Sequence, residues 1–232
     1  DAFIINTEKR NEILDNCSSE EERTKTAELI RPILRGRDIK RYGYNWADLW
    51  LIATFPSRHY DIEMYPAVKA HLDQYWDKIS KRADKGDTPY NLRNCAYLDD
   101  FFKPKVMWKI IGCNINFSFD DGTMICNNAV DIMTGQRNQL LQFLGLMNSK
   151  LFDWYLKLTT EAEVQGGGIQ LYVTTLEKTL VKLDFPLYLS EIINQRVNGI
   201  ASDKEVDNTI FESYKLTQEE IDYILSCKQV DR

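Results

Sequence analysis

The sequence feature that most constrains the fold is a stretch of period-two alternation between two regions of helical spacing. Apolar and polar side chains alternate over residues 105–133, a pattern typical of strands with one buried face. Within this stretch, Asp-Asp-Gly at residues 120–122 predicts a hairpin turn. We therefore expect an α+β fold, with a mixed β-sheet or hairpin core, flanking helices and a helical C-terminal third.

Apolar residues recur at helical spacing on both sides of this stretch. The clearest pattern covers residues 65–82, where one apolar stripe follows Pro66, a residue suited to the first turn of a helix. Capping-box spacing at helix starts is found twice, for Ser19 with Glu22 and for Thr217 with Glu220. The expected helices cover residues 6–14, 18–30, 65–82, 136–158 (with a break near 148–149), 188–197, 207–214 and 216–225. A buried strand is expected at 48–55, and loops at 84–91 and 164–171.

Composition places the chain among ordinary globular proteins. Its 232 residues are 44% hydrophobic and 28% charged, and no apolar run approaches the ~18 residues of a membrane span. The five cysteines form no CxxC pair, which favours reduced thiols in the cytoplasm over zinc sites or disulfides. The chain begins without Met or a signal-like segment, so we expect a fragment of a longer cytoplasmic protein, called the parent here.

Charge is distributed unevenly along this acidic chain, whose formal net charge is -6. Residues 31–110 carry a net charge of +5, whereas residues 1–30 and 111–232 carry -4 and -7. Five of the cations surround one glycine within residues 30–44: Arg31, Arg35, Arg37, Lys40 and Arg41. A basic middle between acidic ends indicates a surface that faces a polyanion, and the alternative is uneven charge on solvated faces.

Several catalytic patterns are incomplete in this sequence. His59 and His71 lie outside any metal-binding spacing, and the glycine run at residues 166–168 lacks the Lys-Ser/Thr of a phosphate-binding loop. Asp-Thr-Pro-Tyr at residues 87–90 is similar to the loop in which adenine methyltransferases hold a flipped base, but Thr88 replaces the expected proline.

A nuclease pattern is incomplete too. Asp38 and Lys40 have the local spacing of a metal-dependent nuclease, but the basic neighbours oppose a metal cluster. The sequence therefore favours a domain without its own catalysis. A self-sufficient enzyme that uses Asp38 with Lys40, or Asp87 with Tyr90, is the weakest alternative.

A series of blocks along the chain occurs in the order of a known family. The blocks are LRGRDIKRY (34–42), WLIAT (50–54), YPAVKAHLDQY (65–75), ISKRADKG (79–86), PYNLR (89–93), FKPKVMW (102–108) and LGLMNSKLFDWYL (144–156). Together they resemble the target-recognition domain of type IIG restriction–modification enzymes, the TaqI-like C-terminal specificity domain. LRGRDIKRY and LMNSKL are the most specific blocks, and the likeness spans almost the whole chain.

The resemblance implies a module that recognises a specific sequence in double-stranded DNA and has no catalytic site. It implies that the parent holds an adenine-specific methyltransferase and an endonuclease N-terminal to this chain, and that the module positions DNA for them. The parent would use S-adenosylmethionine and magnesium, whereas this chain would bind no cofactor, metal or membrane. Residues 1–158 would form the target-recognition core with lead-in helices. Residues 159–232 would form a loop and helical region that packs on it or continues the same domain.

A recognition module needs cations for phosphates and hydrogen-bonding side chains for base edges. The predicted phosphate contacts are Arg35, Arg37, Lys40, Arg41, Lys81, Arg82, Lys85 and Arg93. The predicted base contacts are Asn114, Asn116, Asn127, Asn128, Gln136, Arg137 and Asn138. Gly36 would let the backbone come close to the DNA, and Asp38 would orient an arginine or cap the next element.

Two alternatives remain open. The block at residues 34–42 is equally suited to packing against the methyltransferase domain, and the cations at 78–93 to a solvated helix end. The whole chain is alternatively an assembly module of a restriction–modification complex. In that case the helices within 136–158 and 187–227 would dock a partner subunit.

Overall fold

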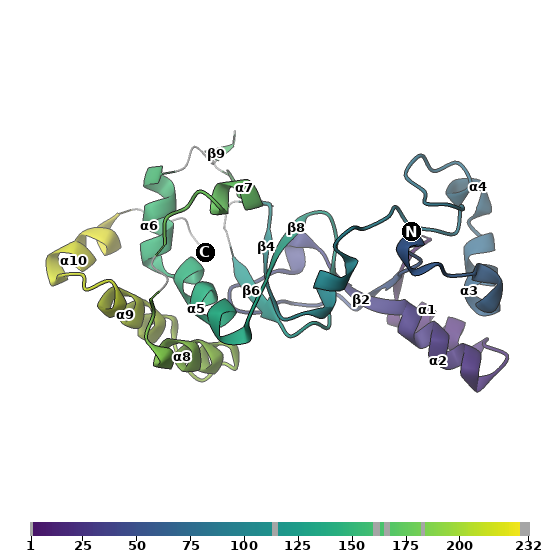
Figure 1. Cartoon of the computed structure of the whole chain (residues 1–232), viewed down its shortest axis with the longest axis horizontal. Coiled ribbons are helices and arrows are strands. Elements are labelled where there is room, and N and C mark those ends of the chain that lie inside the picture. Colours follow the sequence, from purple (N-terminus) through teal and green to yellow (C-terminus); the bar gives the residue numbers. More distant parts are fainter. Residues whose placement is uncertain (1, 113–115, 160–162, 165–167, 182–183, 228–232) are drawn as a thin grey trace. The chain divides into compact units, whose positions relative to one another are not determined.

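Figure 1 shows the computed structural model of the chain, in which the described residues are 2–112, 116–159, 163–164, 168–181 and 184–227. The expected α+β class is confirmed. The chain forms two compact units, each assembled from separate stretches of sequence. Unit one consists of residues 1–34, 46–99 and 123–125, and unit two of residues 35–45, 100–122 and 126–232. A boundary at residue 158 would fall inside unit two.

Unit one is built on a four-stranded sheet with the strand order β1-β3-β2-β7. Strands β1 (Ile4–Asn6) and β2 (Ile30–Leu34) both pair antiparallel with the central strand β3 (Leu49–Ile52). Strand β7 (Ile125–Cys126) lies at the edge next to β2. The buried strand expected at residues 48–55 is thus confirmed in β3, where Ile52 is fully buried.

The first two helices of unit one begin at side-chain caps, of which the one at Ser19 was predicted from the sequence. Asn6 caps α1 (Thr7–Asp15) and Ser19 caps α2 (Glu20–Leu29) by accepting a hydrogen bond from the backbone N–H of Glu22. Glu22 does not complete the predicted capping box. Its carboxylate accepts hydrogen bonds from the backbone of Ser18, at 2.8 Å, and of Ala67, at 3.0 Å, in the first turn of the next helix. One buried side chain therefore links two helices.

The single helix predicted for residues 65–82 is wrong. The structure has two helices, α3 (Pro66–Asp73) and α4 (Trp76–Ile79), because the backbone leaves the helical region at Tyr75. Leu72 and Ile79 are buried, but the Trp76 side chain is 45% exposed and lies against Tyr90 with ring centroids 5.5 Å apart. The apolar stripe is thus divided between the core and an aromatic pair at the surface.

Unit two contains an antiparallel sheet with the order β6-β4-β8. The central strand is β4 (Lys105–Lys109), which pairs with β6 (Phe117–Asp120) and β8 (Val130–Thr134). The predicted pairing across the turn at 120–122 is wrong, because the chain already reverses between β4 and β6. Gly122, with φ of 101°, does turn the chain, but it leads into β7.

A second, smaller sheet of unit two has the order β5-β10-β9. Its strands are β5 (Ile111–Gly112), β9 (Glu163–Val164) and β10 (Gly168–Gln170). Residues 168–170 were expected in a loop, so that prediction is wrong for them. The part of the chain that the structure describes also has four 3-10 turns, at Gly36–Asp38, Pro56–Arg58, Ile62–Met64 and Leu98–Phe102.

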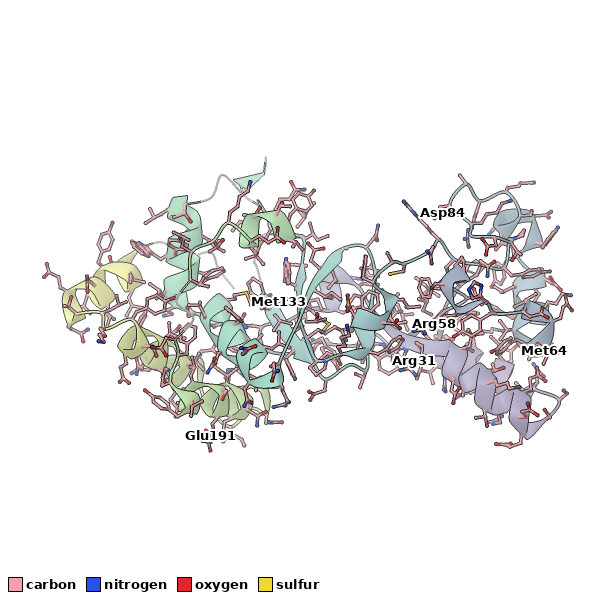
Figure 2. All side chains as sticks on the ribbon, viewed as in Figure 1. Arg31, Arg58, Met64, Asp84, Met133 and Glu191 are labelled. Carbon is pink, nitrogen blue, oxygen red and sulfur yellow. The ribbon has the colours of Figure 1, made fainter. Side chains whose placement is uncertain are left out.

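Helix α5 (Arg137–Asn148) packs against the larger sheet of unit two, and further helices pack on it in turn. The other helices of the unit are α6 (Lys150–Thr159), α7 (Val173–Leu176), α8 (Leu187–Val197), α9 (Asp203–Ser213) and α10 (Gln218–Ser226). Helices α5, α8 and α9 lie together beside this sheet in Figure 1. Their buried side chains and those of β4 and β6 form one core, against which Met133 of β8 packs (Figure 2). The predicted break at residues 148–149 and the Thr217–Glu220 capping box are confirmed.

Candidate functional site

An open pocket of about 730 Å³ lies within unit two. Its lining comes from three stretches and one further side chain: Arg35, Gly36 and Arg37; Lys109, Ile110 and Ile111; Asn127, Asn128 and Ala129; and Tyr172. We call it the Arg37 pocket. Two predicted phosphate contacts, Arg35 and Arg37, thus share a pocket with two predicted base contacts, Asn127 and Asn128, from about 90 residues further along the chain.

Backbone hydrogen bonds hold the walls of the Arg37 pocket together. Ile110, which follows β4, donates its N–H to the carbonyl of Ala129 at 3.0 Å. Its own carbonyl accepts the N–H of Leu171 at 2.8 Å, which places Tyr172 beside it. Asn127 accepts the N–H of Ala129 through its side-chain oxygen at 3.2 Å. The pocket is therefore built on paired backbone rather than on free loops.

The turn at Gly36–Asp38 packs directly against one of these walls. Gly36 is buried, and a Cβ at this position would lie 3.2 Å from the carbonyl oxygen of Ala129 and 3.5 Å from the Cβ of Lys109. The close approach that glycine permits here is thus to the protein's own backbone. We had expected an approach of the Gly36 backbone to DNA.

Asp38 fixes the orientation of Arg35. The carboxylate accepts the Arg35 backbone N–H at 2.8 Å and the guanidinium at 3.0 and 2.8 Å. Burial opposes the charge of Asp38, but these hydrogen bonds outweigh burial and hold its pKa below the ordinary value. Asp38 thus orients a neighbouring arginine and closes the turn, so the guanidinium of Arg35 is rigid and partly neutralised.

Arg37 is the exposed cation of this turn. Within the part of the chain that the structure describes, its side chain makes no hydrogen bond or ion pair, and its carbonyl accepts a bond from the Lys40 ammonium at 3.2 Å. Lys40 and Asn128 are exposed as well. The pocket therefore presents the exposed guanidinium of Arg37 and the exposed amide of Asn128, with Lys109 and Asn127 in its lining, and such groups suit phosphate oxygens and base edges.

Arg41 is engaged differently from Arg37. Its guanidinium forms an ion pair with Asp203, donates to the carbonyl of Asn148, and lies 5.4 Å from the centre of the Tyr42 ring. The side chain therefore binds α9 and the end of α5, and it does not line the Arg37 pocket.

The remaining predicted phosphate contacts lie in unit one. Lys81 and Arg93 are exposed. Arg82 donates to the carbonyl of Asn91 at 2.8 Å and lies 4.5 Å from the centre of the Phe3 ring, so it packs on its own unit. Lys85 donates to the carbonyl of Ser80 at 2.9 Å near the end of α4, as expected for a cation at a helix C-terminus.

The other predicted base contacts do not line the Arg37 pocket. Gln136, Arg137 and Asn138 lie at the start of α5, where Arg137 donates to Asp121 at 3.1 Å and to Asn194 at 3.1 Å. Asn116 is half-buried before β6, and Asn114 lies outside the described residues. Two lining residues, Lys109 and Tyr172, were missed, because the alternating pattern gave no indication of which strand end would meet the basic turn.

The residues that the structure describes contain no cluster of three or more His, Cys, Asp or Glu side chains that could hold a metal ion. His71 is buried against the carbonyl of Ala2 at 3.0 Å, and the exposed His59 ends a 3-10 turn. None of the described helices has the length and apolar character needed to cross a membrane.

Comparison with a protein-family model identifies the chain. Residues 31–179 match the TaqI-like C-terminal specificity domain. The chain belongs to this family. The match covers every residue that lines the Arg37 pocket, and it confirms the resemblance found in the sequence blocks.

Further comparisons address the fold of this specificity domain. No curated protein matches it significantly. Among solved structures, it is similar to the type IIL restriction-modification enzyme MmeI, determined in complex with DNA, with a TM-score of 0.65 at 14% sequence identity. The similarity covers 96% of this chain and 32% of the MmeI chain. The specificity domain therefore shares a fold with about a third of that enzyme.

Proposed function

We propose that this specificity domain is the double-stranded DNA recognition module of a restriction–modification protein. Family membership supports this function, and so does the fold shared with an enzyme whose structure was determined with DNA. The single observation that carries the proposal is the Arg37 pocket. It brings a lysine, two asparagine side chains and an exposed arginine that has no ion-pair partner among the described residues to one open pocket of an acidic chain.

The side chains of the pocket suit two kinds of contact with DNA, one with phosphates and one with base edges. Arg37 binds a phosphate, because its guanidinium is exposed and makes no ion pair with any residue that the structure describes. Asn128 presents an exposed amide beside it, and an amide can make two hydrogen bonds to the edge of an adenine, whereas the side-chain oxygen of Asn127 already accepts the N–H of Ala129. Phosphate contacts set the register of the domain on the duplex, and amide contacts select the sequence.

The finer part of the proposal concerns the parent protein. The module serves a type IIG enzyme and positions DNA for adenine methylation and cleavage by domains outside this chain. Those domains use S-adenosylmethionine and magnesium. The sequence blocks that resemble type IIG target-recognition domains support this assignment.

The first test is Arg37→Ala in the full-length protein, with DNA affinity measured across a series of salt concentrations. Loss of one phosphate contact should weaken binding to all sequences and reduce the log–log salt slope by about 0.9. Lys204→Ala is the matched control, because it removes one exposed cation from α9, away from the pocket lining. Equal effects of the two variants would show that Arg37 acts only through net charge, and would refute the pocket as the contact surface.

A second test addresses sequence selection. Exchange of this domain between two family members with different specificities should move the methylated site with the domain. An unchanged site after the exchange would contradict the recognition function, whatever Arg37→Ala does.

An assembly function is the second candidate, supported by exposed apolar side chains on the helices of unit two. Leu187 is 87% exposed and Tyr188 50% at the start of α8, and Tyr223 is 60% exposed on α10. If these helices dock a partner subunit, Leu187→Asp should abolish subunit association and leave the DNA affinity of the protein unchanged. An effect of Arg37→Ala on the salt slope, with association intact in Leu187→Asp, favours recognition.

A further inference from the structure

The basic turn is one end of a small hairpin in unit two. Ile39 and Tyr44 form a β-bridge, and the carbonyl of Gly43 accepts the N–H of Lys40 at 2.8 Å. The N–H of Asn45 donates to the carbonyl of Asp38 at 2.8 Å, which closes the base of the hairpin beside Arg35 and Arg37. Residues 41–42 form the tip of this hairpin, so paired backbone connects the tip to the turn that lines the Arg37 pocket.

The tip is held by a set of side chains that we call the Asp203 clasp: Arg41, Tyr42, Arg196 and Asp203. Asp203, the first residue of α9, forms ion pairs with both Arg41 and Arg196. Both guanidinium groups lie over the Tyr42 ring, 5.4 Å from its centre for Arg41 and 4.6 Å for Arg196. The clasp thus connects the hairpin tip to α8 and α9, more than 150 residues away in the sequence.

A second contact fixes the tip against the sheet. The N–H of Tyr42 donates to the carbonyl of Phe117 at 2.8 Å. Asn148 accepts the N–H of Phe117 at 3.1 Å and donates to its carbonyl at 2.9 Å, and the Asn148 carbonyl accepts a bond from Arg41. The arginine therefore bridges the end of α5 and the start of α9.

Tyr42 shows that these contacts hold the tip in a conformation of higher energy. Its φ of 68° is in the left-handed region, which is unfavourable for a residue other than glycine. Its ring is 2% exposed, and its hydroxyl finds no hydrogen-bond partner among the described residues. Burial raises the pKa of this hydroxyl well above the ordinary value, so the phenol stays neutral. Such a conformation persists only where the surroundings determine it.

We propose that Arg41, Arg196 and Asp203 are positioning residues for DNA recognition. They fix the hairpin tip, and through it they fix Arg37 in the pocket. Helices α8 and α9, which lie beyond the segment matched by the family model, thereby control DNA affinity without contact to the DNA. This inference rests on the proposed function of the Arg37 pocket.

The inference is tested by the direction in which Asp203→Asn changes the DNA affinity of the full-length protein. Removal of one negative charge should strengthen binding to DNA, or leave it unchanged, if Asp203 acts only through charge or if Arg41 is released to bind a phosphate. The clasp predicts the opposite sign, a loss of affinity of about 2- to 30-fold, because the turn is no longer held. Glu191→Gln is the matched control: it removes an exposed negative charge from the outer side of α8 (Figure 2).

A double-mutant cycle separates positioning from general destabilisation. If the clasp acts through Arg37, Asp203→Asn should have little further effect on affinity in an Arg37→Ala background. Additive effects of the two changes would overturn the inference, as would unchanged or increased affinity in Asp203→Asn. Should Asp203→Asn not fold, Asp203→Glu keeps the charge and moves the carboxylate, so it should still weaken binding. Unchanged affinity in that variant would count equally against the clasp.

The same series distinguishes the two proposals. If Arg37→Ala leaves the salt slope unchanged, the pocket is not the contact surface and the proposed function of the site fails. If Arg37→Ala reduces the slope and Asp203→Asn does not weaken binding, only the clasp fails.

Discussion

Lys105 and Asp120 form an ion pair that is almost completely buried in the sheet of unit two, with side chains 0% and 2% exposed. Lys105 also donates to the carbonyl of Phe101 at 2.7 Å, and Asp120 accepts the N–H of Gly122 at 3.0 Å. The other carboxylate oxygen of Asp120 accepts a hydrogen bond from the Tyr44 hydroxyl at 3.3 Å, so both charged groups have hydrogen-bond partners nearby. A buried pair of this kind is costly to break, because the remaining charge stays in a medium of low dielectric constant.

We expect Lys105→Met to lower the free energy of unfolding by about 3–5 kcal/mol, since it leaves Asp120 buried without its partner. Chemical denaturation measures the change. Lys103→Met, two residues away, is the control, because the Lys103 side chain is 57% exposed in its pair with Asp100 and such surface pairs contribute about 0–1 kcal/mol. Similar losses in both variants would contradict this account.

Asp38 gives the fold a dependence on pH that can be assigned to one group. The folded-state pKa of Asp38 lies below its unfolded value, so its stabilisation is fully present above about pH 4 and is lost as the pH falls through the folded-state pKa. Asp38→Asn should therefore lower the free energy of unfolding at neutral pH by about 1.5–3 kcal/mol, the range for hydrogen bonds to a charged group. The difference from wild type should shrink towards pH 2. A difference that is constant with pH would show that the charge of Asp38 does not matter.

The sequence showed where the cations cluster, but not what each of them binds. The pairing of Arg35 with Asp38 is local, three residues apart, and was one of two roles expected for Asp38. The partner of Arg41 lies 162 residues away, and no local pattern contains that information. Charge spacing alone therefore could not separate Arg37, which is exposed, from Arg41, which is tied to two helices.

At the scale of elements, helix starts were predictable because their signals are local. Ser19 and Thr217 cap helices as their spacing predicts. The predicted strand pairing at residues 105–133 was wrong, since packing of the core and not the turn signal at 120–122 decides which strands pair with β4. The prediction of one helix at 65–82 was wrong for a similar reason. Burial of Ile79 and pairing of Trp76 with Tyr90 favour a break that helix propensity does not encode.

Helices α5 and α8 approach each other closely at Gly145. A Cβ there would lie 2.4 Å from Cδ1 and 2.8 Å from Cγ1 of Ile193, which is fully buried. Gly145→Ala gains about 1 kcal/mol of helix propensity, but overpacking of a filled core costs about 1–3 kcal/mol. We therefore expect net destabilisation, measured as a lower midpoint of denaturation.

Ile193→Val supplies the control for this prediction, because it removes the Cδ1 atom that the new Cβ would meet. The double variant should be more stable than Gly145→Ala alone. If Ile193→Val destabilises both backgrounds equally, the close approach of α5 and α8 is not the cause.

At the scale of the whole chain, the segment matched by the family model is shorter than the folding unit. The match ends at residue 179, yet Leu189, Ile193, Val206 and Ile210, on α8 and α9, are each fully buried in the core of unit two. Burial of four such side chains contributes roughly 6–12 kcal/mol, which is comparable to the entire stability of a typical domain, about 5–15 kcal/mol.

We predict that a chain ending at residue 185 loses the cooperative folding of unit two. Hydrogen exchange at the amides of β4 should become fast in this variant, since the core that β4 shares with α5, α8 and α9 is lost. A chain ending at residue 216 is the control: it lacks only α10, whose single buried residue is Ile224. Full protection of β4 in the shorter chain would show that α8 and α9 are dispensable.

The discontinuous make-up of the two units has a consequence for the way such domains can diverge. Unit one is interrupted by residues 35–45 and is completed only by residues 123–125, whereas unit two supplies the intervening segments. A recombination breakpoint between residues 35 and 126 would therefore give each unit a mixture of parental sequences, with cores that did not evolve together. Gene exchange that transfers a working specificity should keep its breakpoints outside this interval.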